Sequence, residues 1–328
     1  MAAEALEAAE FRLLERLLGG RIESAERAPW GFTNKTDVLT LVGGERVVLQ
    51  RYVDQSVAQH RMRLTSGLRG PLLARGVPIP RLIRADLHGD PPYALYEALP
   101  GIPGPTFLDE GRSNHTWQIL TTEMGRMLQV VSAVPITDIP PLPSLWADPN
   151  LLAKRAAGWL DDSQPDLSAT AAGEVRRLIA AVPGLFKGRG SVLAHGDFAP
   201  ANVLVSDDRI SALLDWEFAR RADPLFDVAW WGWLVRYHHP GEYAAAWPIL
   251  LEAAAFHKQD ERFEDQVFTL QALRLLELAT TSGDSSARLM WTLRLSETML
   301  TAPRDGSRPR DHESLPMRWT SRSARAIE

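Results

Sequence analysis

The sequence of 328 residues contains no cysteine. The chain therefore has no disulfide bond, no thiolate metal site and no cysteine nucleophile, and this composition fits a reducing cytoplasm, where we expect the protein to reside. The sequence also lacks an apolar run of about 18 residues, so we expect neither a membrane-spanning helix nor a membrane partner. The net charge of −5 lacks the basic excess typical of nucleic-acid-binding domains, which argues against a nucleic-acid partner.

Both ends of the chain have a distinct composition. The first 18 residues carry four glutamates instead of the basic and then apolar pattern of a signal peptide. Their leucines recur at helical spacing before Gly19-Gly20, which predicts a surface helix over residues 3–18. Residues 301–328 are rich in Arg, Ser, Pro and Asp but have few aliphatic side chains, which predicts a loose tail.

Secondary-structure signals change near residue 100. Before it, strands alternate with turns, and one helix is predicted over residues 57–75. The predicted strands cover residues 38–42, 46–52, 81–85 and 93–97. A segment rich in proline and glycine follows at residues 100–105 and marks a boundary.

Beyond residue 114 the pattern is mostly helical until about residue 300, apart from a β-rich segment over residues 191–216. We therefore predict two lobes, over residues 1–97 and 98–300. The second lobe has 17 basic and 25 acidic side chains. Such an acidic excess would favour a cationic substrate, although an ordinary solvated surface explains it equally well.

The β-rich segment brings polar side chains together. Residues 202–205 and 210–214 are short apolar runs on either side of a four-residue turn, which predicts a hairpin. Asn202 and Asp215 then lie at the same end of this hairpin, and Asp197 lies on the loop before that end. We therefore expect two carboxylates and an amide to converge.

Phosphoryl transfer requires such a set. Magnesium, which holds the triphosphate of the donor, prefers oxygen ligands and keeps several waters, and Asn202 and Asp215 offer such oxygens. A separate carboxylate must orient the acceptor hydroxyl and take its proton, a role open to Asp197. Protein kinases use the same spacing, Asp-x-x-x-x-Asn followed by an Asp after the next strand.

Three linked motifs resemble the aminoglycoside phosphotransferase and choline kinase-like family. The motifs are His195-Gly-Asp-Phe-Ala-Pro-Ala-Asn202, Leu214-Asp-Trp-Glu217 and Asp223-Pro-Leu-Phe-Asp227-Val-Ala229. The resemblance extends over about residues 30–233. It implies an α+β, two-lobed protein-kinase-like fold, with a small β-rich nucleotide-binding N-lobe, a larger and mostly helical catalytic C-lobe, and the active site in the cleft.

The family pattern also implies roles for single residues. Asp197 would be the catalytic base, and Asn202 and Asp215 would hold Mg²⁺, with ATP or GTP as the phosphoryl donor. His195 is interpreted as a support of the loop through hydrogen bonds. The two aspartates of the third motif, Asp223 and Asp227, are interpreted as structural ties between the following helix and this loop.

The N-lobe departs from the family pattern at its phosphate-binding positions. Gly31, Thr33 and Asn34 belong to a segment that resembles the phosphate-covering hairpin and offer donors to phosphate oxygens. The next strand should supply a Lys or Arg. Register places Gln50 there, whereas charge favours Arg51, and strand alternation sends the two to opposite faces. Both remain candidates.

The acidic partner of that cation is missing as well. No acidic residue lies between Asp54 and Asp86, and Thr65 stands near the position of the family's helical Glu. If Gln50 faces inward, the loss of both the strand cation and the helical Glu is understandable, because a buried Glu without its cation is costly. These departures support an alternative: a catalytically weak, kinase-like nucleotide-binding protein.

Residues 93–101 resemble the hinge strand, where backbone groups near Glu97 and Leu99 would read the edge of the base. Glu217, directly after Asp215 and Trp216, is predicted to be an acceptor-side carboxylate. The helical remainder concentrates tryptophans, most of which we expect in the core and a few around an apolar or cationic acceptor. These tryptophans are Trp230, Trp231, Trp233, Trp247 and Trp291.

We therefore predict a small-molecule kinase that moves the γ-phosphoryl group of a nucleoside triphosphate to a hydroxyl of a small acceptor. The acceptor is expected to be an aminoglycoside, a macrolide or a metabolite alcohol, and the first two would give a role in antibiotic resistance. A phosphatase or other hydrolase is less favoured, because no second set of metal ligands and no nucleophile accompanies the acidic cluster.

Overall fold

The computed structural model describes residues 8–28, 35–111, 113–163, 166–256 and 261–300. These residues form two compact units, each discontinuous in sequence. Unit 1 holds the described residues up to Thr116 together with Ile136–Pro141 and Pro200–Phe218, and unit 2 holds Trp117–Pro135, Leu142–Ala199 and the described residues from Ala219 onward. The lobe boundary predicted at residues 97 and 98 stays a prediction.

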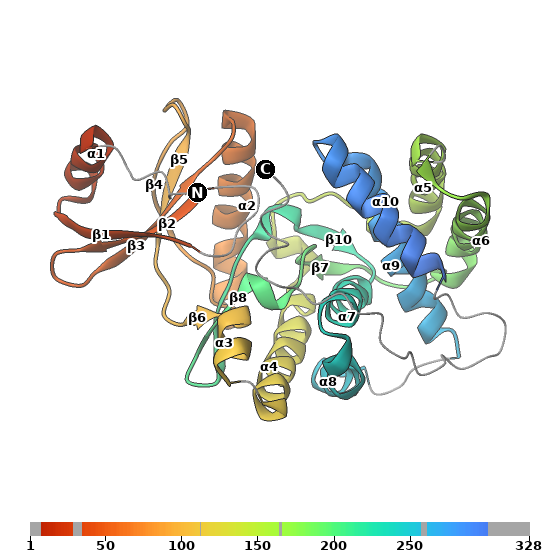
Figure 1. The fold of residues 1–328 in the computed structure, drawn as a ribbon. Helices are drawn as coiled ribbons and strands as arrows, with labels where there is room; N and C mark the ends of the chain where they lie inside the picture. The colour runs from red at the N-terminus through yellow and green to blue at the C-terminus, as the bar shows by residue number, and fades with distance from the viewer. Residues whose placement is uncertain (1–7, 29–34, 112, 164–165, 257–260, 301–328) are drawn as a thin grey trace. The chain divides into compact units, whose positions relative to one another are not determined.

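Unit 1 contains the predicted β-rich part of the chain (Figure 1). Its strands are β1 (Ile22–Arg27), β2 (Lys35–Leu41), β3 (Arg46–Arg51), β4 (Leu82–Asp86), β5 (Tyr93–Glu97), β6 (Ile102–Pro103), β8 (Val203–Ser206) and β9 (Arg209–Leu213). Its helices are α1 (Ala8–Leu18), α2 (Gln55–Leu73) and α3 (Gly104–Gly111), with short 3₁₀ turns at Pro200–Asn202 and Trp216–Phe218. Of the predicted first helix, residues 3–7 lie outside the described residues, as does the predicted tail over residues 301–328.

The main sheet of unit 1 is antiparallel, with strand order β1-β2-β3-β5-β4. Helix α1 packs on one face, where Leu14 meets Leu49 of β3, and α2 packs on the other, where Met62 meets Tyr52. Helix α2 begins at Gln55 because the carboxylate of Asp54 accepts the backbone N–H of Val57 at 2.9 Å, which is the ordinary N-cap arrangement.

The predicted hairpin is present as β8 and β9, with Val203 opposite Leu213. Its turn residues Asp207 and Asp208 both have a positive φ, of 50° and 59°, as the twist of a tight hairpin requires. Strand β6 pairs with β8 and completes a three-stranded sheet. The hairpin thus belongs to unit 1.

Unit 2 is mainly helical (Figure 1). Its helices are most of α4 (Asn114–Ser132), α5 (Pro149–Ser163), α6 (Ala169–Leu185), α7 (Phe226–His238), α8 (Pro240–Ala253), α9 (Phe263–Thr281) and α10 (Ser285–Leu300). Strands β7 (Val192–Ala194) and β10 (Arg220–Ala222) form a small antiparallel pair. Helix α9 is buried almost throughout and packs against α5, α6, α7 and α10, which makes it the centre of this unit.

In the described part of the chain, no helix has both the length and the apolar character that crossing a membrane requires.

Candidate active site

Asn202 and Asp215 lie at the same end of the β8–β9 hairpin. The backbone N–H of Leu214 donates to the carbonyl oxygen of Asn202 at 2.8 Å, and this bond links the two strands at the open end of the hairpin. Asn202 is buried, whereas the side chain of Asp215 is 42% exposed. The proximity predicted from the turn is therefore confirmed, and the role of the two residues as metal ligands stays a prediction.

The backbone of Asp215 is in the left-handed region, with a φ of +58°. Few residues other than glycine adopt this conformation, and Asn and Asp do so most readily. Outliers of this kind often mark functional positions. Asp215 lies two residues after the end of β9 and directly before the 3₁₀ turn that begins at Trp216.

The charge next to Asp215 comes from helix α2. The guanidinium of Arg61 lies with Nη1 at 3.7 Å from Oδ1 of Asp215, and it forms a closer ion pair with Glu217. Arg61 is buried, and Nε2 of its neighbour His60 lies 3.1 Å from the carbonyl oxygen of Glu217. Sequence reasoning missed Arg61. The available signal was that this helix carries basic residues but no acidic ones, so its cations must pair with carboxylates elsewhere in the chain.

Strand β3 directs Gln50 and Arg51 to opposite faces, as alternation predicts. Gln50 is on the α2 face, where its Oε1 accepts the hydroxyl of Tyr52 at 3.0 Å. Arg51 is on the α1 face and pairs with the buried Asp37, which also binds Arg27 at 2.6 Å. Which of the two contacts a phosphate stays a prediction, but the side chain on the same face as Arg61 is the neutral one.

Two tyrosines extend this polar cluster on the α2 face. The hydroxyls of Tyr52 and Tyr96 lie 3.2 Å apart, and burial raises the pKa of both. Arg61 and Asp215 also act on the pKa of Tyr52, the first lowering it and the second raising it. The cluster therefore offers neutral hydroxyl groups beside a charged pair, Arg61 and Asp215.

In unit 2, Asp197 is held by helix α7. The indole Nε1–H of Trp230 donates to Oδ1 of Asp197 at 2.9 Å, and the backbone N–H of Asp197 donates to Nδ1 of His195 at 3.3 Å. His195 is fully buried. The interpretation of His195 as a support of the loop is confirmed.

The loop before Asp197 is fixed by Asp227. Its buried carboxylate accepts the backbone N–H of His195 at 2.6 Å and that of Gly196 at 2.9 Å. Burial raises the pKa of Asp227, while the charge of His195 and these two bonds act in the opposite direction. The predicted tie between this loop and the following helix is therefore confirmed for Asp227.

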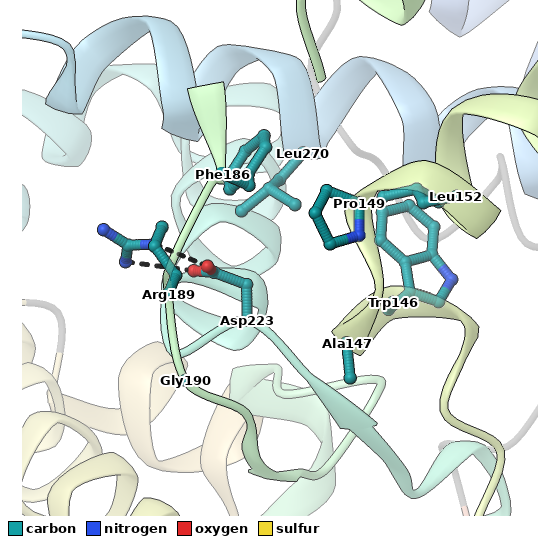
Figure 2. A pocket seen from close by; sticks show the side chains of 9 residues that line it. All are labelled: Trp146, Ala147, Pro149, Leu152, Phe186, Arg189, Gly190, Asp223 and Leu270. Atoms are coloured by element: carbon teal, nitrogen blue, oxygen red, sulfur yellow. Dashed lines mark hydrogen bonds and ion pairs between the residues drawn. The ribbon is translucent and has the colours of Figure 1, made fainter. Parts of the chain in front are cut away.

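Asp223 ties other elements together. Its carboxylate accepts from Nε and Nη2 of Arg189, at 2.5 and 3.1 Å, and from the backbone N–H of Leu225 at 2.8 Å. Figure 2 shows the Arg189–Asp223 pair among the residues that line a small pocket, which also include Phe186 and Trp146. This pocket has a volume of about 10 Å³, room for about one water molecule. It is too small for an acceptor.

A second layer of buried charge lies behind the loop on α9. Nη2 of Arg274 donates to the carbonyl oxygen of Gly196 at 3.3 Å, and the same guanidinium lies over the ring of Trp230 at 5.6 Å. Glu277 balances it and also pairs with Arg220 at 3.0 Å. Arg274 and Glu277 are three residues apart on α9, but Gly196 and Arg220 are distant from them in sequence, so no sequence motif indicated this layer.

Most of the tryptophans belong to the core, as expected. Trp230, Trp231 and Trp233 are buried. The rings of Trp230 and Trp233 stack at 5.1 Å, and Nε1 of Trp231 donates to Sδ of Met124 at 3.3 Å. Trp247 and Trp291 are half-buried, and the latter lies under Arg294 at 4.7 Å.

The remaining predicted residues are placed as follows. Glu97, at the end of β5, accepts the backbone N–H of Arg81 at 2.8 Å, and Leu99 is half-buried in the segment that follows β5. The segment with Gly31, Thr33 and Asn34 lies outside the described residues. The roles proposed for all of these in nucleotide binding stay predictions, as does the acceptor role of Glu217.

The chemistry of Asn202 and Asp215 fits a magnesium ion. Among the described residues, no group of three or more His, Asp or Glu side chains is arranged to hold a metal. Magnesium needs fewer protein ligands, because it is usually held by one or two carboxylates, waters and substrate phosphates. An amide and an accessible carboxylate at one hairpin end meet that requirement.

Comparisons with known proteins identify the family of this chain and its fold. A model of the phosphotransferase enzyme family matches residues 24–276. No curated protein matches the sequence. The structure resembles the macrolide 2′-phosphotransferase MphH from Brachybacterium faecium, with 18% identity, a TM-score of 0.65 and coverage of 90% of this chain and 98% of that one.

Two aminoglycoside phosphotransferases give similar values. A GDP and kanamycin complex of APH(2″)-IIIa has 14% identity and a TM-score of 0.68, covering 90% of this chain and 99% of its own. A ternary complex of an APH(4)-Ia mutant with AMP-PNP and hygromycin B has 15% identity and a TM-score of 0.64, with coverage of 89% and 98%. These likenesses show the predicted protein-kinase-like fold. Because the family model matches most of the sequence, the chain belongs to the phosphotransferase enzyme family.

Proposed function

We propose that the protein transfers the γ-phosphoryl group of ATP or GTP to a hydroxyl of an aminoglycoside- or macrolide-type acceptor. The observation that carries this proposal is the end of the β8–β9 hairpin, where Asn202 and Asp215 present an amide and an accessible carboxylate. Asp197 precedes Asn202 by five residues, the spacing of the kinase catalytic loop.

In this mechanism each residue has a separate task. Asp197 orients the acceptor hydroxyl and takes its proton, and the indole N–H of Trp230 fixes the orientation of its carboxylate. Asn202 and Asp215 would hold Mg²⁺, which, when bound, neutralises the charge on the phosphates. Asp227 keeps the backbone of the loop in place.

Two observations support the acceptor class. Similar structures include a macrolide 2′-phosphotransferase and complexes with kanamycin and hygromycin B. Residues 98–300 also carry an excess of acidic side chains, and both antibiotic classes carry amino groups that are cationic at neutral pH. The donor is supported by relatives that hold GDP or AMP-PNP.

A panel of aminoglycosides, macrolides and simple amino alcohols, each tested with ATP and with GTP in the presence of Mg²⁺, tests the proposal. We expect nucleotide consumption and a product heavier by one phosphoryl group for at least one antibiotic. A magnesium-dependent thermal shift without consumption of either nucleotide across the panel would instead favour the weakly catalytic alternative.

Trp230→Phe tests how Asp197 is positioned. The substitution removes the donor to Oδ1 while keeping most of the ring. A hydrogen bond to a charged group contributes about 1.5–3 kcal/mol, so we expect kcat to fall about tenfold or more with little change in the KM for nucleotide. Trp231→Phe is the matched control, because that buried indole donates to Met124 instead. Equal losses of kcat in both variants would contradict the assignment.

A further inference from the structure

The α2 face of β3 lacks the cation that phosphoryl transfer requires. In kinases a lysine on this strand contacts the donor phosphates and is held by a glutamate from the next helix. Here the strand presents Gln50 to that face, and its neighbour Arg51 is on the other face with Asp37. The family resemblance would put the helical glutamate near Thr65 of α2. Both members of the usual pair are therefore replaced by neutral side chains.

The same face contains a cation from a different element. Arg61 of α2 is 8% exposed, lies 3.7 Å from the carboxylate of Asp215, and influences the same Tyr52 hydroxyl that donates to Gln50. These groups all belong to unit 1. The positive charge absent from the α2 face of β3 is thus present beside the expected metal ligand.

A carboxylate holds Arg61 in place, as a glutamate holds the phosphate-binding lysine of kinases. Glu217, two residues after Asp215, forms the closer ion pair with its guanidinium. A buried cation is costly unless it is paired, and Glu217 offsets that cost from the hairpin side. In kinases the cation is on the strand and its carboxylate partner is on the helix. Here the cation is on helix α2, and its carboxylate partner, Glu217, follows strand β9.

We propose that Arg61, positioned by Glu217, binds the donor phosphates in place of the missing lysine of β3, an inference that rests on the proposed phosphotransferase function. A guanidinium suits this task because its planar fork matches phosphate oxygens. The departures at Gln50 and Thr65 then do not indicate a weakened phosphate site. Glu217 has a positioning role here, in place of the acceptor-side role predicted from the sequence.

The test compares binding of adenosine, ADP and a non-hydrolysable ATP analogue, with the guanosine series in parallel, by calorimetry in the presence of Mg²⁺. For Arg61→Gln we expect unchanged nucleoside affinity but about tenfold or more weaker binding of the triphosphate, with an intermediate loss for the diphosphate. Arg63→Gln is the matched control, because Arg63 is exposed on the same helix. It should bind every ligand as the wild type does.

Two further variants separate charge from folding. Arg61→Lys keeps the charge and should retain part of the triphosphate affinity, and Gln50→Lys added to Arg61→Gln should recover it by returning the cation to β3. Thermal melts check that each variant is folded. Equal affinities for wild type and a folded Arg61→Gln, or tighter binding by the variant, would overturn the inference and leave the proposed function intact. A wild-type protein that binds no nucleotide would overturn both.

Discussion

Asp197→Ala is expected to abolish phosphoryl transfer while leaving the fold intact. The side chain is half-buried on the loop after β7 and accepts a hydrogen bond from the indole N–H of Trp230. General-base catalysis contributes about 10²- to 10⁴-fold to the rate, so turnover in an acceptor-dependent assay should fall by that factor. Nucleotide affinity should change little, because the residue is not expected to contact the donor.

Asp197→Asn provides the control for this variant, since it keeps the size of the side chain and an oxygen that accepts from Trp230. It should be as inactive as Asp197→Ala, because a carboxamide cannot take the proton. Substantial transfer by either purified variant would remove Asp197 as the base. A shared loss of the thermal transition would point instead to a structural role of the carboxylate.

Asp215→Asn is expected to eliminate magnesium-dependent turnover. The variant should fold, because asparagine adopts the left-handed backbone of this position as readily as aspartate does. It removes the anionic ligand, and metal-ion contributions of several kcal/mol correspond to a loss of about 100-fold or more. Calorimetry with the triphosphate analogue, with and without Mg²⁺, measures the effect directly.

In the wild type, we expect magnesium to increase the affinity for the triphosphate, and in Asp215→Asn this increase should disappear. Asp208→Asn is the matched control, because that aspartate also has a positive φ and lies in the turn at the opposite end of the same hairpin. If Asp215→Asn keeps the response to magnesium, Asp215 is not a metal ligand.

Much of the candidate site was predictable because it depends on local geometry. The hairpin from Val203 to Leu213 follows from two apolar runs and a turn, and it fixes the proximity of Asn202 and Asp215 without reference to the rest of the fold. The alternation that separates Gln50 from Arg51 is equally local, since it is a property of any strand. Such features can be predicted from the local pattern of apolar and polar residues alone.

The parts that sequence reasoning missed depend on packing between distant segments. Arg61 meets Glu217 across 156 positions of sequence, and Arg274 reaches the carbonyl of Gly196 from α9. Neither pair has a sequence motif, because the partner of a buried charge must be close in space but can lie at any distance along the sequence. The absence of acidic residues between Asp54 and Asp86 predicts the loss of an ion pair, whereas the structure places Arg61 in this stretch with carboxylate partners after β9.

The discontinuity of the two compact units has a consequence for how the protein is made. The chain leaves unit 1 after Thr116, and the hairpin that completes this unit is reached only at Pro200. A ribosome has therefore finished β1–β5 well before β8 emerges to pair with β6, and β9 to pair with β8. Domains generally fold as their chain becomes available, so unit 1 cannot be completed before much of unit 2 has been synthesised. Neither unit is encoded by one contiguous stretch of sequence. The segment from Asp197 to Asp215 belongs to both units, so the proposed catalytic groups are synthesised only after β1–β5 and much of unit 2.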